Sequence, residues 1–249
     1  NFKYKSGGNI IMNEYDLNEM RNEQGVYVNV ETTNKFLRKV FLNMVIGVLI
    51  TTLVPIYLFG FNARLLYAIM PYFKIIMFAE IALVFGLSLG INKMSSGTAR
   101  MMFFLYSLMN GILFSSLGFV FHPVSIFYTL GVALIMFIVI AAYGYTTSED
   151  LSNYGKYLMT GLISIIIMSV INFFLKAPFL YWIGTVLGIV IFSALIAYDV
   201  NRIKKIAFQM ANGDEEAMNK LGIIGALNLY LDFINLFLYL LRIFGKRRR

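Results

Sequence analysis

Three acidic side chains, Glu80, Asp199 and Asp232, lie in or at the end of long apolar runs of the sequence. A charge at the middle of a bilayer costs on the order of 2.5–3.5 kcal/mol on insertion scales, so such acids normally face a bundle interior and have partners. Carboxylates in this setting can exchange protons and can bind hard cations through their oxygens. We therefore take these three residues as candidate functional groups.

Asp232 belongs to a polar stripe that also contains Asn228, Asn235 and Tyr239. The spacing i, i+4, i+7 and i+11 puts the four side chains on one face of a helix. This face either lines a water-filled path for cations, to which Glu80 could contribute, or it forms hydrogen bonds with polar groups on neighbouring helices. The sequence leaves both interpretations open.

The composition identifies the elements that must position these residues. The chain has 249 residues, of which 59% are hydrophobic and 14% charged, whereas soluble domains carry about 25% charged residues. A hydrocarbon core about 30 Å thick requires about 20 mainly apolar residues per helix, and only helices or closed barrels satisfy their backbone groups in lipid. We predict an all-α membrane protein whose seven transmembrane helices lie near residues 40–61, 73–91, 101–121, 124–145, 157–175, 179–198 and 222–243.

One transmembrane domain, residues 35–245, accounts for nearly the whole chain. Residues 1–34 are expected to form a mobile tail without the apolar core of a secretory signal peptide, and residues 1–11, which precede Met12, could be non-native. Residues 246–249 form a basic C-terminal tail. The sequence contains no cysteine, which excludes disulfides and thiolate chemistry. The spacings Gly86 to Gly90 and Gly184 to Gly188 allow close helix packing.

The net charge of +8 does not indicate a nucleic-acid partner, because the basic residues are scattered over loops. Loops on the N-terminal side of the membrane carry most of them, whereas the opposite loops carry Arg64, Lys74 and Lys176. Because positively charged loops stay in the cytoplasm, we expect a cytoplasmic N-terminus. The basic C-terminal tail then lies outside, unless the last segment does not fully cross; we expect it to cross.

Two segments resemble known family motifs. Leu229 to Phe237 reads LYLDFINLF and is followed by Leu240-Leu241-Arg242, which resembles the last-span signature of the Bax inhibitor family, the transmembrane Bax inhibitor motif proteins. Tyr198-Asp199, followed by Asn201 and Ile203, resembles the motif at the end of the same family's sixth span. Order, spacing and the seven-span layout agree over about residues 35–245.

The resemblance implies a last helix enclosed by the other six and a pH-controlled calcium leak rather than an enzyme. It implies no tightly bound cofactor; the partners would be the lipid bilayer, protons and Ca²⁺ as the transported ion. It also implies that Asp199 and Asp232 form a proton-sharing pair that senses pH. Where family members place an arginine in the second span, this chain has Ile91-Asn92-Lys93, so Lys93 and Arg100 are the candidate basic partners.

A carboxyl pair of this kind can act as a switch. Two carboxylates in hydrogen-bond reach inside a bundle cannot both ionise cheaply, so one keeps its proton and donates a hydrogen bond to the other. That bond would tie the sixth helix to the seventh, and a change in protonation would weaken the tie. The oxygens of Asp199 and Asp232 could also bind Ca²⁺ transiently. Either direction of pH gating is compatible with the sequence.

Two other functions stay open. A regulatory membrane protein could act through partner proteins without conducting ions. An intramembrane aspartyl protease would also need two aspartates on adjacent helices, but such proteases carry Gly-x-Gly before the second aspartate, and here Leu229-Tyr230-Leu231 precede Asp232. The short loops and the richness in Ile, Asn, Lys, Phe and Tyr favour a bacterial inner membrane; the membrane of the endoplasmic reticulum or another organelle is the alternative.

Overall fold

A computed structural model describes residues 30–209 and 214–248 of the chain. Three parts of the chain lie outside these ranges: most of the expected N-terminal tail, the dipeptide Asn212-Gly213, which is typical of a turn, and Arg249. Within them, every regular element is a helix. The first one begins at Val30, slightly before the domain boundary expected at residue 35.

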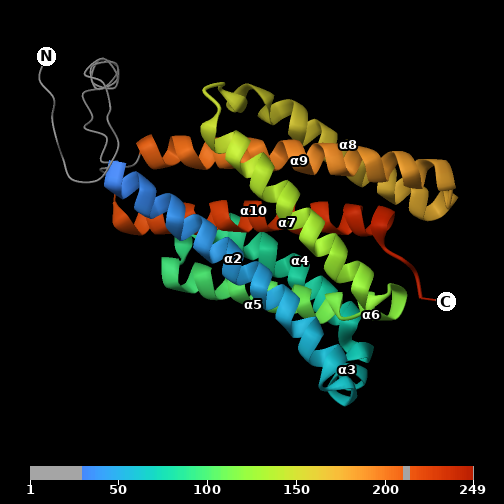
Figure 1. Ribbon diagram of the computed structural model, residues 1–249. Helices are drawn as coiled ribbons and strands as arrows, with labels where there is room; N and C mark the ends of the chain where they lie inside the picture. The colour runs from blue at the N-terminus through green and yellow to red at the C-terminus, as the bar shows by residue number, and fades with distance from the viewer. Residues whose placement is uncertain (1–29, 210–213, 249) are drawn as a thin grey trace, which may run out of the picture.

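The helices follow one another with short connections (Figure 1). In chain order they are α2 (Val30–Gly60), α3 (Ala63–Ile69), η1 (Met70–Tyr72), α4 (Phe73–Gly90), η2 (Ile91–Lys93), α5 (Ser96–Phe114), α6 (Leu117–Val120), α7 (Pro123–Thr146), η3 (Leu151–Tyr154), α8 (Gly155–Leu175), α9 (Pro178–Gln209) and α10 (Glu215–Phe244).

The seven predicted spans are confirmed. Seven helical stretches of the described chain are long and apolar enough to cross a membrane: Thr33–Gly60, Ala63–Lys93, Ser96–Val120, Pro123–Thr146, Leu151–Leu175, Pro178–Gln209 and Glu215–Phe244. The second stretch is interrupted by η1, which contains Pro71 at its start, where the missing N–H of proline breaks no helical hydrogen bond. The sixth helix continues beyond the predicted span, to Gln209.

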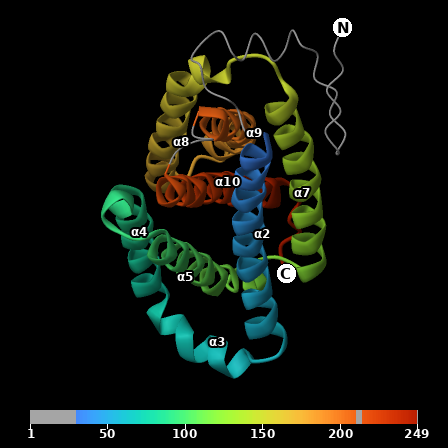
Figure 2. The same ribbon diagram turned by 90° about the vertical axis from the view of Figure 1, so that its left-hand side faces the viewer.

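Helix α10 is the most buried of the seven. Two thirds of its apolar window (67%) is buried, compared with 6% for the second and fifth spans. It packs mainly against α9, α2, α7 and α5, while α4 packs on α5 and α8 packs on α9 (Figure 2). The core of the bundle is therefore built around α10, and its enclosure by all six other helices stays a prediction.

Two glycines allow helices to touch. A Cβ atom on Gly144 of α7 would overlap the backbone of Ala197 on α9, so these helices meet backbone to backbone. A Cβ atom on Gly188 of α9 would lie 2.5 Å from the Tyr239 ring of α10, whereas one on Gly184 would lie 3.4 Å from the Met168 sulfur. Of the Gly184 and Gly188 pair, Gly188 is thus the position at which a side chain would not fit.

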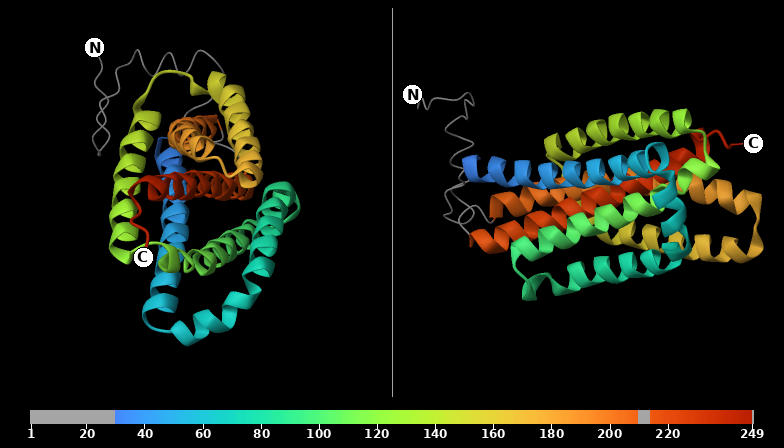
Figure 3. Two further views of the ribbon diagram at one scale, coloured as in Figure 1. Left: turned by 90° about the vertical axis from the view of Figure 1, so that its right-hand side faces the viewer. Right: turned by 90° about the horizontal axis from the view of Figure 1, so that it is seen from below.

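The beginnings of α2 and α10 lie at one end of the bundle, where Lys39 Nζ donates to Asn219 Oδ1 at 3.2 Å. The C-terminal tail lies at the opposite end (Figures 1 and 3). Helix α10 has 30 residues and is about 45 Å long at 1.5 Å per residue, which exceeds the hydrocarbon core of about 30 Å. The last segment is therefore long enough to cross fully.

Candidate functional site

Asp199 of α9 and Asp232 of α10 line one cavity of about 840 Å³, which α8, α9 and α10 surround. Both side chains are buried, with exposed fractions of 8% and 7%. The Asp232 carboxyl group lies within range of the Asp199 charge. The structure thus brings together the two acids that the sequence motifs single out, and it turns both into the protein.

The proton shared by the pair stays a prediction, and one carboxyl oxygen of the pair is unsatisfied in this structure. In the described part of the chain, no hydrogen bond joins Asp199 to Asp232, and the buried Oδ2 atom of Asp232 has no hydrogen-bond partner. A buried polar atom without a partner is rare and costly in folded proteins. The unsatisfied Oδ2 atom of Asp232 is therefore a free position for the expected shared proton.

Arg202 is the basic residue at this cavity. It lies one helical turn after Asp199 on α9, lines the same cavity and places its charge within range of Asp199. Lys93 at the end of η2 and Arg100 on α5 are exposed and do not line the cavity. The sequence analysis missed Arg202, although its i+3 spacing from Asp199 is the spacing of helical ion pairs.

The other members of the polar stripe, Asn228, Asn235 and Tyr239, also line this cavity. Asn235 Nδ2 donates to the Leu231 carbonyl at 2.8 Å, which fixes the amide on its own helix. The Tyr239 ring stacks on Phe192 of α9. The predicted stripe therefore faces a cavity along its whole length, as the interpretation of a lined path requires.

Glu80 lies apart from this cavity. It projects from α4 toward the Tyr106 hydroxyl of α5 and does not line the cavity of the aspartates. Beyond Tyr106, the Thr51 hydroxyl hydrogen-bonds the Tyr230 hydroxyl at 2.6 Å and donates to the Ser107 carbonyl at 2.9 Å. The acids predicted as one cation path thus occupy two separate polar regions.

Among the described residues that line the cavity, Asp199 and Asp232 are the only acids, and none is a histidine. Among the residues that the structure describes, no group of three or more His, Cys, Asp or Glu side chains could hold a metal ion. A Ca²⁺ ion takes six to eight oxygen ligands. A transient site at Asp199 and Asp232 would therefore need amide, hydroxyl and water oxygens to complete it.

Comparison with known proteins gives consistent matches over nearly the whole chain. Residues 33–249 match the family model Bax1-I, described as inhibitor of apoptosis-promoting Bax1. The inner membrane protein YbhL of Escherichia coli K12 is 41% identical over 215 residues, which cover 86% of this chain and 92% of YbhL. An uncharacterized protein of Borreliella burgdorferi is also 41% identical, over 86% of this chain and 93% of its own. One from Rickettsia prowazekii is 35% identical, over 88% and 92%.

Proposed function

We propose a function from the premise that the chain belongs to the Bax1-I family of membrane proteins. In this proposal the protein is a pH-sensitive calcium leak channel, and Asp199 and Asp232 together sense protons. The proposal includes a bacterial inner membrane as its location and a cytoplasmic N-terminus. The loop charges support this orientation, and the inner-membrane relative YbhL supports the location.

One observation carries the proposal: two buried carboxyl groups from adjacent helices line the same cavity. Two like charges about 4 Å apart repel by roughly 4 kcal/mol at an effective dielectric constant of about 20. Loss or gain of one proton therefore changes the interaction energy between α9 and α10 by an amount comparable to the free-energy difference between two conformations. The pair titrates as a unit, and its protonation sets how firmly the two helices hold together.

The same cavity offers ligands for a passing cation. The carboxylates, the amide oxygens of Asn228 and Asn235 and the Tyr239 hydroxyl are hard oxygen ligands, which suit Ca²⁺. Arg202 opposes them with one positive charge. With both acids ionised the three charged groups sum to −1, and with one acid protonated they sum to zero. Protonation thus also changes the electrostatic attraction of the cavity for Ca²⁺.

The full-length protein in liposomes that contain a calcium dye tests this function. Native protein should admit Ca²⁺ at a rate that depends on pH, and Asp199→Asn or Asp232→Asn should remove that dependence. Asp150→Asn is the matched control, because it removes a carboxylate that is exposed and lies outside the cavity.

Two results would contradict the proposal. If both folded variants keep the native pH response, the aspartates are not the sensor. If native protein admits no Ca²⁺ at any pH, the regulatory alternative without ion conduction replaces the channel.

A further inference from the structure

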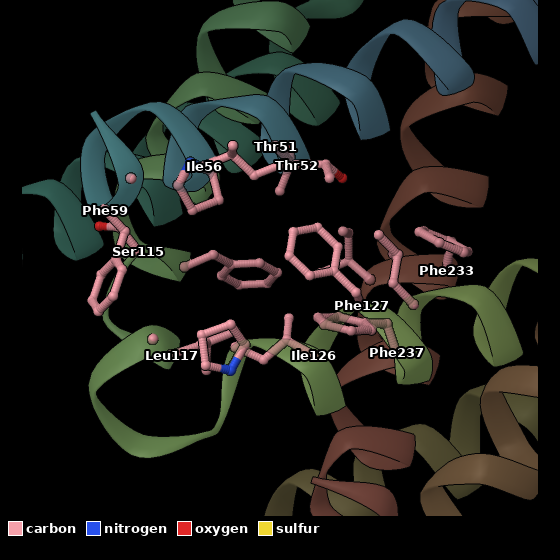
Figure 4. Close-up of a pocket in the computed structure, with 17 residues that line it drawn as sticks. Thr51, Thr52, Ile56, Phe59, Ser115, Leu117, Ile126, Phe127, Phe233 and Phe237 are labelled. Carbon is pink, nitrogen blue, oxygen red and sulfur yellow. The ribbon is translucent and has the colours of Figure 1, made fainter. Parts of the chain in front are cut away.

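A second cavity lies on the opposite side of α10, among α2, the α5–α6 segment, α7 and α10 (Figure 4). Its volume is about 300 Å³, at the small end of ligand pockets. Aromatic and aliphatic side chains make up most of its wall, including Phe59 of α2, Phe127 of α7 and Phe237 of α10. We call it the α2–α7–α10 cleft.

The few polar groups on this wall are already hydrogen-bonded within the protein. Thr51 bonds Tyr230 and the Ser107 carbonyl, and Thr52 donates to the carbonyl one turn before it on α2. Ser115 donates to the Ile112 carbonyl. The hydroxyl hydrogens of these residues are therefore used within the protein, and the mainly apolar wall suits an apolar guest.

The basic C-terminal tail is fixed at the rim of the cleft. Arg248 Nη1 donates to the Gly118 carbonyl at 3.0 Å, and its guanidinium group lies 5.7 Å from the centre of the Phe59 ring. Gly118 and Phe59 both line the cleft. Backbone bonds from His122 N to Lys246 O and from Arg248 N to Val120 O hold the tail along the α6–α7 connection.

The tail brings positive charge to this rim. The side chains of Lys246, Arg247 and Arg248 are exposed, and within the described residues none of them is in an ion pair. The surrounding faces of α2 and α7 are apolar and open; Leu53 is 59% exposed and Val124 is 69% exposed. An apolar cleft in a membrane surface with a basic rim has the chemistry of a lipid site.

We propose that the α2–α7–α10 cleft binds an anionic phospholipid. One acyl chain occupies the cleft, and the phosphate group contacts the basic side chains of residues 246–248. A free phosphate ion would use only the rim, whereas a lipid uses both the rim and the apolar wall. The bound lipid joins α2, α7 and the tail, and it contacts α10 on the face opposite Asp232.

Photo-crosslinking of the full-length protein in nanodiscs tests this site. The discs contain phosphatidylcholine and a small fraction of phosphatidylglycerol with a diazirine on its acyl chain, and mass spectrometry locates the labelled residues. Labelling should concentrate on cleft residues of α2 and α7. An equal amount of labelled phosphatidylcholine should mark the cleft less.

Two kinds of variant separate the contributions of headgroup and acyl chain. Arg248→Gln should lower the preference for phosphatidylglycerol about fivefold, since one basic residue at the surface contributes about that factor, and replacing residues 246–248 together should remove it. Lys176→Gln, an equal charge change at the α8–α9 connection, should leave the preference unaltered. Ile126→Phe, which fills the cleft, should reduce labelling by both lipids.

The proposal is overturned if labelling spreads evenly over the lipid-facing helices. It is also overturned if a folded variant that combines Lys246→Gln, Arg247→Gln and Arg248→Gln keeps the native preference. Inorganic phosphate could also abolish the preference for phosphatidylglycerol while acyl labelling in the cleft stays unchanged. That result would show that the rim and the cleft act separately, which contradicts a single lipid site.

Discussion

The two faces of α10 differ in chemistry although both are buried. One face carries Asp232, Asn235 and Tyr239 into the larger cavity. The other carries Phe233, Ile234 and Phe237 into the α2–α7–α10 cleft. On the polar face a carboxylate oxygen lacks a hydrogen-bond partner, whereas the threonines and the serine around the cleft are satisfied within the protein. This difference indicates that the polar face can change with protonation and that the apolar face serves packing and binding of apolar groups.

The largest effect on stability is expected from placing an acid on the apolar face of α10. Ile234→Asp places a carboxyl group among aromatic rings, where only 6% of the native side chain is exposed. We expect a loss of about 3 kcal/mol in the free energy of unfolding, because the site offers no partner. Denaturation of the purified protein in detergent, followed by circular dichroism, measures it.

The matched change on the polar face is Asp232→Asn, which keeps the shape and removes the charge. It should leave the free energy of unfolding nearly unchanged or raised, since a buried carboxylate is replaced by a neutral group. Equal destabilisation by Ile234→Asp and Asp232→Asn would show that the two faces do not differ as described.

A smaller effect is expected at the contact between α9 and the polar face. Gly188→Ala should cost about 1–3 kcal/mol, because its Cβ atom would overlap the Tyr239 ring and overpacking has this magnitude. Gly184→Ala is the control on the same helix, since its Cβ atom has room beside Met168. Thermal unfolding of both variants in detergent checks this, and equal stability of the two would remove the argument for a tight contact at Tyr239.

The smallest effect is expected at Asp150, outside both cavities. Its hydrogen bonds with Lys205 and Ser152 lower the pKa of Asp150 from 3.8 to about 2. A lowered pKa means that the interaction stabilises the fold above about pH 3.8 and is lost as the pH falls through about 2. The Lys205 pair thus stays intact at all milder pH values. Because the Asp150 side chain is exposed, its pair with Lys205 contributes little free energy, so Asp150→Asn should change neither the pH response of Ca²⁺ entry nor, measurably, stability near neutral pH. A shifted pH response in the liposome assay would show that the sensor extends beyond the two aspartates.

The sequence allowed the spans and the acid pair to be predicted for different reasons. The spans follow from composition, because a long apolar segment that crosses lipid must be a helix to satisfy its backbone hydrogen bonds. The polar stripe follows from helical spacing, and Asn228, Asp232, Asn235 and Tyr239 do line one cavity. The pairing of Asp199 with Asp232 follows from the resemblance to the motifs of the family's last two spans, and both residues do line one cavity.

What the sequence could not supply is which helices lie beside which. Glu80 is an acid within an apolar span, as a residue of a cation path would be. However, α4 packs on α5, so the Glu80 carboxyl group faces Tyr106 instead of the aspartates. The position of the family's arginine points to Lys93 and Arg100, whereas Arg202 reaches the cavity from the helix of Asp199 itself. The contact of Arg248 with Gly118 joins residues far apart in the chain, and no local pattern predicts it.

The most direct test of the proton-sharing pair is a double-mutant cycle on the pH dependence of Ca²⁺ entry in liposomes. Asp199→Asn, Asp232→Asn and the double variant are compared with native protein at acidic and neutral pH. If the two acids act as one titrating unit, the double variant should change the pH dependence no more than either single variant does. Effects that add in full, each acid contributing its own separate titration, would contradict the pair.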